Sequence, residues 1–175
     1  MNGHRWARWL GLLVVAVLVL PAGCAPPPKK RQFNNLLSGL NEDLAVAAKE
    51  FYGTLEPVSK GGNPQQGAPR AAYDKCKVAL RKVQEVFDGT WPPRNSIKGV
   101  SFRLAYSDYL KAQHKILDDY FAEIVAICES KQAPGAKWTK ISPLVEQAGK
   151  IDKEAYDALI SAQGEFAQAH NYTPK

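Results

Sequence analysis

The chain has 175 residues, of which 45% are hydrophobic and 23% are charged, as is ordinary for a globular protein of one domain. The net charge of +6 does not indicate a basic binding face, because five of the 23 basic residues lie in the first 31 positions. The rest of the chain carries 18 basic residues against 17 acidic ones, which argues against nucleic acid as a partner.

Residues 1–23 have the pattern of an export signal. Arg5 and Arg8 precede an apolar run over residues 10–20, and small residues follow it. A permanent transmembrane anchor is the alternative, but a spanning helix needs about 20 apolar residues and this run is shorter and ends at Pro21. We therefore expect a cleaved leader.

The leader ends in Leu20-Pro21-Ala22-Gly23-Cys24, which resembles the lipobox of bacterial lipoproteins. Ala22, Gly23 and Cys24 match its last three positions, whereas Pro21 stands where that family usually has an aliphatic residue. The resemblance implies cleavage before Cys24, acylation of its thiol with fatty acids such as palmitate, and anchoring in a membrane. The resemblance also implies that Ala25, which is not Asp, directs the protein to the outer membrane where the organism has one.

Residues 24–32 are predicted to form the lipidated cysteine and an extended tether. Three prolines at positions 26–28 favour polyproline II, and Lys29, Lys30 and Arg31 follow them. These basic side chains would lie near anionic headgroups, where each adds about 1 kcal/mol to membrane binding. A plain solvated spacer is the alternative.

Residues 33–175 are predicted to form one helical domain. Apolar residues recur every three or four positions in four segments, which we place at about Asn34–Glu56, Ala68–Asp88, Ser101–Ser130 and Ser142–Ala169. Glycines and prolines separate these segments, and Ser142 with Pro143 has the pattern of a helix start. No segment has a sustained strand pattern. Four amphipathic helices with short connections favour an all-α fold, an antiparallel up-down four-helix bundle.

We find no catalytic or metal-binding pattern and expect no cofactor and no enzyme activity. A di-iron bundle requires Glu-x-x-His pairs, and covalent haem requires Cys-x-x-Cys-His; neither occurs. His114 falls within the third helix, and we expect His170 to be a partly charged imidazole at the end of the fourth. Asp118, Asp119 and Glu123 are interpreted as a solvated face.

Two tryptophans lie in predicted loops. Trp91 and Trp138 would form a recognition surface if exposed, whereas the alternative is that both rings cover the ends of the core.

Cys76 and Cys128 are the two cysteines that remain beside Cys24, and we predict a disulfide between them because an exported compartment permits it. The bond requires the third helix to start about 22 Å beyond the end of the second, at 1.5 Å per residue. Two separate reduced thiols are the alternative.

The leading functional hypothesis is a membrane-anchored lipoprotein of the cell envelope whose helical domain is non-catalytic and binds an envelope protein or has a structural role. The alternative is a module that binds a small ligand between its helices, with a pocket lined by Tyr106, Tyr120 and Phe51. A cleft that gathers His114 with two carboxylates would indicate an enzyme instead.

Overall fold

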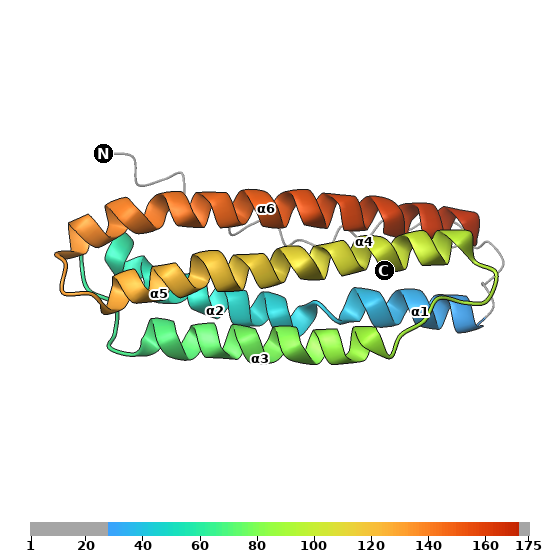
Figure 1. Cartoon of the computed structure of the whole chain (residues 1–175), viewed down its shortest axis with the longest axis horizontal. Helices are drawn as coiled ribbons and strands as arrows, with labels where there is room; N and C mark the ends of the chain where they lie inside the picture. The colour runs from blue at the N-terminus through green and yellow to red at the C-terminus, as the bar shows by residue number, and fades with distance from the viewer. Residues whose placement is uncertain (1–27, 172–175) are drawn as a thin grey trace.

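The computed structural model describes residues 28–171, and every regular element in this range is helical, with no strand (Figure 1). The predicted all-α class is therefore confirmed. The elements form four long rods that lie side by side along the long axis of the molecule. In chain order they are α1 (Pro28–Gly39), α2 (Glu42–Ser59), α3 (Ala68–Asp88), α4 (Ile97–Lys115), the π-helical segment η2 (Ile116–Phe121), α5 (Ala122–Glu129) and α6 (Pro134–Ala169).

Helix α3 has the bounds that the sequence predicts. Gly67 precedes it with a φ of 74°, a left-handed conformation that glycine adopts without strain, and Pro69 occupies the first turn, where a missing N–H costs no hydrogen bond. Gly89 follows the last helical residue. The predicted apolar stripe is buried in full: Tyr73, Cys76, Leu80, Val83 and Phe87.

The first rod differs from the single predicted helix in two ways. It is interrupted at residues 40–41, which separate α1 from α2. It also begins at Pro28, so Lys29, Lys30 and Arg31 belong to the first turns of α1 and not to an extended tether. The physical reason is the burial of Phe33 (5% exposed), whose ring packs edge-on against Phe102 and Phe166 and holds the start of α1 on the core.

Helix α6 starts eight residues earlier than predicted. The sequence pattern makes Ser142 the cap and Pro143 the first residue, but the helix begins at Pro134 and Pro143 lies inside it. Tertiary contacts fix the additional two turns. Ile141 is fully buried, and the buried Lys137 donates through Nζ to the carbonyl oxygen of Cys128 at 2.8 Å. These contacts outweigh the hydrogen bond that an internal proline removes.

The segment η2 displaces the second half of the stripe that the spacing of three and four residues indicates for the third helix. That stripe is Tyr106, Leu110, Gln113, Leu117, Tyr120, Ile124 and Ile127. The amide of Ala122 donates to the carbonyl of Leu117, five residues earlier, which is the π-helical pattern. The wider turn rotates the face that follows it, so Phe121 and Cys128 are buried where the uninterrupted pattern places Tyr120 and Ile127.

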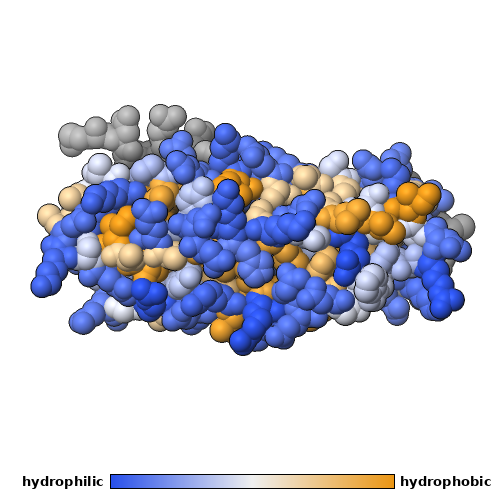
Figure 2. All heavy atoms as spheres, in the orientation of Figure 1, coloured by the Kyte–Doolittle hydropathy of each residue, from blue (hydrophilic) through white to orange (hydrophobic). Residues whose placement is uncertain are grey.

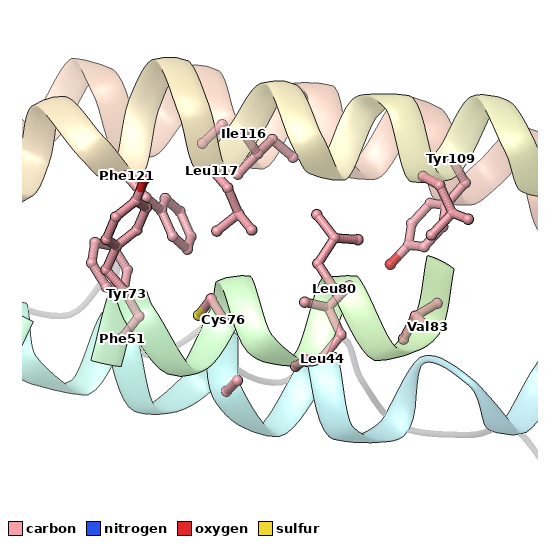
Figure 3. Packing of buried hydrophobic residues seen from close by; sticks show 14 of the residues in the cluster. Leu44, Phe51, Tyr73, Cys76, Leu80, Val83, Tyr109, Ile116, Leu117 and Phe121 are labelled. Atoms are coloured by element: carbon pink, nitrogen blue, oxygen red, sulfur yellow. The ribbon is translucent and has the colours of Figure 1, made fainter. Parts of the chain in front are cut away.

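The core is filled by apolar side chains from all four rods (Figure 3). Phe51 of α2 stacks on Phe121 of η2, with ring centroids 4.0 Å apart, and Phe87 of α3 stacks on Tyr106 of α4 at 5.3 Å. Phe87, in the last turn of α3, thus meets the middle of α4, and Arg70, in the first turn of α3, pairs with Glu129 at the end of α5.

Candidate functional site

One end of the molecule brings together the start of α1, the linker 89–96 between α3 and α4, and the end of α6 (Figure 1). The imidazole of His170 joins these three elements. Its Nδ1 lies 3.1 Å from Nζ of Lys30, and its Nε2 lies 3.1 Å from Oγ of Ser96. Ser96 caps α4 by accepting from the amide of Gly99 at 3.0 Å. The side chains therefore fix the linker and α1 to the end of α6.

The surroundings of His170 favour the neutral form of its imidazole. Its pKa is lowered from the ordinary value, first because burial disfavours the charged imidazolium and second because the ammonium group of Lys30 repels it. The tautomer that satisfies both contacts accepts from Lys30 at Nδ1 and donates from Nε2 to Ser96. The position of His170 at the end of the helix agrees with the sequence analysis, whereas the lowered pKa disfavours the partial charge that was expected there.

The aromatic ring of Trp91 is exposed yet held in place. The guanidinium carbon of Arg103 lies 4.4 Å from the ring centroid of Phe87 and 4.6 Å from that of Trp91, so the cation stands between the two rings. Nε of Arg103 also donates to the carbonyl of Thr90 at 2.8 Å. Trp91 nevertheless remains 73% exposed, and it is therefore presented to the outside in a defined orientation.

An apolar surface continues from Trp91 along the outer face of α4. Ile97, Val100 and Leu104 are 83%, 49% and 60% exposed, and their spacing of three and four residues aligns them on the side opposite the core. We call these three residues together with Trp91 the α4 apolar patch. Figure 2 shows hydrophobic surface among hydrophilic side chains over the part of the molecule where α4 begins. A shallow hollow lined by Pro92 and Pro93 adjoins the patch.

The same end is rich in positive charge. The segments that form this end, residues 28–33 of α1 and residues 89–104 of the linker and α4, contain six basic residues and no acidic one: Lys29, Lys30, Arg31, Arg94, Lys98 and Arg103. Glu165 of α6 pairs with Lys98 at 2.7 Å. The end of the bundle therefore has an excess of positive charge beside exposed apolar side chains.

The predicted recognition surface of Trp91 and Trp138 does not exist as one surface. Gln113 contacts Asp152 and Lys98 contacts Glu165, so the level of Arg103 and Trp91 corresponds to about residue 162 of α6. Trp138 lies some 24 residues before that level, about 36 Å away along the axis. It is also half-buried against the core. The exposure of Trp91 is therefore consistent with a recognition surface. The ring of Trp138 instead covers the core, as the alternative interpretation expects.

The predicted disulfide between Cys76 and Cys128 is wrong, because both cysteines are free and buried. The register of the helices is the reason. Arg70 pairs with Glu129 at 2.7 Å, and Cys76 lies six residues further along α3, about 9 Å from that level. A disulfide requires Cα atoms within about 7 Å. Figure 3 accordingly shows Cys76 facing the neighbouring helix near Leu117.

The linker between α3 and α4 carries the chain a shorter distance along the bundle axis than a disulfide between Cys76 and Cys128 requires. The contact of Arg103 with Thr90 places the end of α3 six residues into α4, so α4 begins about 9 Å beyond that end and not 22 Å. Burial raises the pKa of the Cys76 thiol to about 11 and also raises that of Cys128. Both thiols are therefore protonated and unreactive in the folded protein at neutral pH.

Several buried polar groups connect the rods. Nε2 of Gln163 in α6 donates to Oδ1 of Asn34 at 3.1 Å and to Oγ of Ser38 at 2.6 Å, which fixes α1 against α6. Nε2 of Gln113 donates to Asp152 at 2.6 Å. These contacts are structural in position, since they lie between helices and do not line the hollow beside Pro92 and Pro93 or the one between α2 and α3.

The remaining sequence candidates lie apart. His114 is exposed on α4, Asp118 and Asp119 are exposed on η2, and within residues 28–171 no group of three or more His, Cys, Asp or Glu side chains is placed to hold a metal ion. Tyr106 and Phe51 do not share a pocket, because Tyr106 stacks on Phe87 while Phe51 stacks on Phe121 about 22 Å further along the rod.

Sequence reasoning missed Arg103, Ile97 and Leu104. The signal was present, because Ile97, Val100 and Leu104 have helical spacing, but the predicted helix began at Ser101 and so left Ile97 and Val100 in a loop.

The chain matches no family model, no curated protein and no solved structure. Among the described helices, none is long and apolar enough to cross a membrane. The predicted leader, Cys24 and the first part of the tether lie outside the described residues.

Proposed function

We propose that this protein is a membrane-anchored lipoprotein of the bacterial cell envelope, with a helical domain that binds an envelope protein or has a structural role. The observation that carries the proposal is the sequence Leu20-Pro21-Ala22-Gly23-Cys24 after an apolar run of signal-peptide length. In this proposal the leader is removed before Cys24, the thiol is acylated, and several acyl chains give the stable anchoring that one chain does not.

We further propose that the domain is an antiparallel up-down four-helix bundle. The opposite directions of α3 and the α4–η2–α5 rod support this arrangement, as do the contacts of Lys98 with Glu165 and of Gln113 with Asp152, which require α4 and α6 to run in opposite directions. Such a rigid rod, attached by one end, would hold its far end away from the bilayer by its own length. This geometry suits a spacer or a binding domain presented to another envelope component.

Expression of the full chain in a bacterial host tests the anchor. The wild-type protein should remain in the membrane fraction after a high-salt wash, and its intact mass should equal that of residues 24–175 with acyl groups. The variant Cys24→Ser should lose the acyl mass. Cys76→Ser is the matched control, since it removes a thiol that the folded domain buries, and it should be processed like the wild type.

Two results would contradict the proposal. One is a wild-type protein whose mature N-terminus is not residue 24. The other is a Cys24→Ser variant with the same mass increment as the wild type. Separation of inner and outer membranes on a density gradient then tests the location that Ala25 implies, and recovery in the outer-membrane fraction is the expected result.

A further inference from the structure

We propose that the α4 apolar patch and its basic surroundings dock on the anionic lipid surface in which the protein is anchored, with Trp91 and Ile97 at the level of the headgroups. This inference rests on the proposed lipid anchor and adds to it an orientation, so that one end of the bundle lies on the bilayer and the end with Trp138 points away.

The position of the patch follows from the chain itself. Pro28 begins α1, and Cys24 precedes it by four residues, which span at most about 14 Å. Lys30 and Ser96 both contact His170, so α1 and α4 begin at the same end of the molecule. Neighbouring helix axes lie about 8–10 Å apart, so the start of α4 is within about 15 Å of the start of α1 across the bundle. An anchor at Cys24 therefore confines the patch to the immediate neighbourhood of the bilayer.

This confinement means that a weak affinity is sufficient. A connection of so few residues gives the tethered surface an effective concentration on the order of millimolar. A patch that would not hold a free protein on a membrane is then occupied for much of the time. A surface with a modest affinity for lipid is therefore sufficient to hold this end of the bundle on the bilayer.

The chemistry of the patch is that of an interfacial surface. Tryptophan is enriched at the boundary between headgroups and acyl chains because its ring is apolar and its N–H is polar. Trp91 is 73% exposed and is oriented by Arg103, so its ring is presented without a loss of conformational freedom on docking. Ile97, the most exposed large apolar side chain that the structure describes, lies at the same end.

The charge around the patch fits an anionic surface. The segments at this end, residues 28–33 and 89–104, contain six basic residues and no acidic one. A lipid surface of negative potential attracts such a cluster over about a Debye length, and the long stems of lysine and arginine can lie along the apolar boundary while their charges stay in water. The opposite end also has exposed basic side chains, among them Lys131 and Lys140, but Trp138 is half-buried there and residues 56–70 and 129–143 include no exposed large apolar side chain. The combination of basic and exposed apolar side chains therefore distinguishes the end with Trp91.

The tryptophans provide the experiment. If the leader is removed, Trp91 and Trp138 are the only two that remain, one at each end of the bundle. The lipidated protein is purified as Trp138→Phe, which leaves Trp91, and as Trp91→Phe, which leaves Trp138. Each is reconstituted into vesicles of brominated phosphatidylcholine with and without phosphatidylglycerol, and quenching of the tryptophan fluorescence by bromine is measured.

The expected result is at least roughly twofold quenching of Trp91 with phosphatidylglycerol present, and little quenching of Trp138 in the same vesicles. Ile97→Ser and Leu104→Ser change exposed side chains and should leave the helical circular dichroism unchanged while they reduce the quenching of Trp91. Val78→Ser is the matched control, because Val78 is 43% exposed on α3 and lies outside the patch, and it should change nothing. High salt should weaken the quenching without releasing the protein.

The outcomes separate the docking from the anchor. An acylated protein that sediments with the vesicles but leaves Trp91 unquenched overturns the docking while the proposed function stands; a second copy or a protein partner then covers the patch. A protein without acyl groups that stays in solution overturns the proposed function, and the docking falls with it. Equal quenching of Trp91 and Trp138 would also overturn the orientation.

Discussion

The substitution Phe51→Ala tests whether α2 and η2 are held together by the stacked pair of Phe51 and Phe121. Phe51 is fully buried, and its ring centroid lies 4.0 Å from that of Phe121 with an interplanar angle of 14°. Truncation of a buried phenylalanine costs about 3–5 kcal/mol, because it removes apolar burial and leaves a cavity. The neighbouring helices cannot close this cavity easily, since Tyr52 also contacts Phe121, edge-on at 5.4 Å.

The loss converts into a shift of the melting temperature. Unfolding entropy is about 2.1 cal/mol/K per residue, which gives roughly 0.3 kcal/mol/K for the residues from 28 to 171. A loss of 3–5 kcal/mol therefore lowers the melting temperature by about 10–17 °C. Circular dichroism at 222 nm, followed during heating and during urea titration, measures both quantities. The urea m-value should be unchanged, because the surface exposed on unfolding is nearly the same.

Val46→Ala is the control for this experiment. Val46 lies on the same helix but is 59% exposed, so its truncation should change the free energy of unfolding by less than about 0.5 kcal/mol. If Phe51→Ala lowers the melting temperature no more than Val46→Ala does, the stacked contact is not a stabilising part of the core, and the packing of η2 on α2 described above is incorrect.

Three further predictions follow from the groups described above. Cys76 and Cys128 should both react with a thiol reagent in denatured, unreduced protein and react slowly in the native protein; a reductant should leave the melting temperature unchanged, and a large downward shift would indicate a disulfide. The pKa of His170 is lowered on folding, so the stability that its neutral form contributes is complete above the ordinary pKa of about 6.5 and is lost as pH falls through the lowered value. The urea midpoint should therefore decrease between pH 7 and pH 5. In His170→Gln this decrease should be smaller. Pro143→Ala should raise the free energy of unfolding by about 1–3 kcal/mol, because the exposed residue 143 lies inside α6 and alanine restores a helical amide. An unchanged urea midpoint would mean that the amide of residue 143 forms no helical hydrogen bond.

The sequence alone determined the class of the domain and one helix completely. The all-α class follows from apolar spacings of three and four residues, and α3 keeps its predicted bounds because Gly67, Pro69 and Gly89 act locally at its ends. Local chemistry of this kind does not depend on the rest of the chain. The exposure of Trp91 was left open, since an apolar ring in a loop packs on the core or faces outward depending on its neighbours.

Tertiary contacts decided the helix ends that local signals misplaced. Pro143 after Ser142 is a strong start signal, yet α6 continues through it because Ile141 and Lys137 have partners on α5 and in the core. The extension of α1 back to Pro28 depends in the same way on Phe33 and its aromatic neighbours. Propensities of a few tenths to about 3 kcal/mol per residue are overridden when burial contributes as much.

Only the tertiary structure decided what comes together in space. The axial register between α3 and α5 separates Cys76 from Cys128. This register depends on the axial distance that the linker spans and on the π-helical turn of η2. Neither feature can be recognised from the composition or the periodicity of the sequence. The basic and apolar end exists because His170, Lys30 and Ser96 meet from three elements that are far apart in the chain. Periodicity determines which face of a helix is buried, but many contacts together determine the axial position of one helix against another. A shift of one turn, about 5.4 Å, leaves the same periodic pattern of apolar residues facing the core.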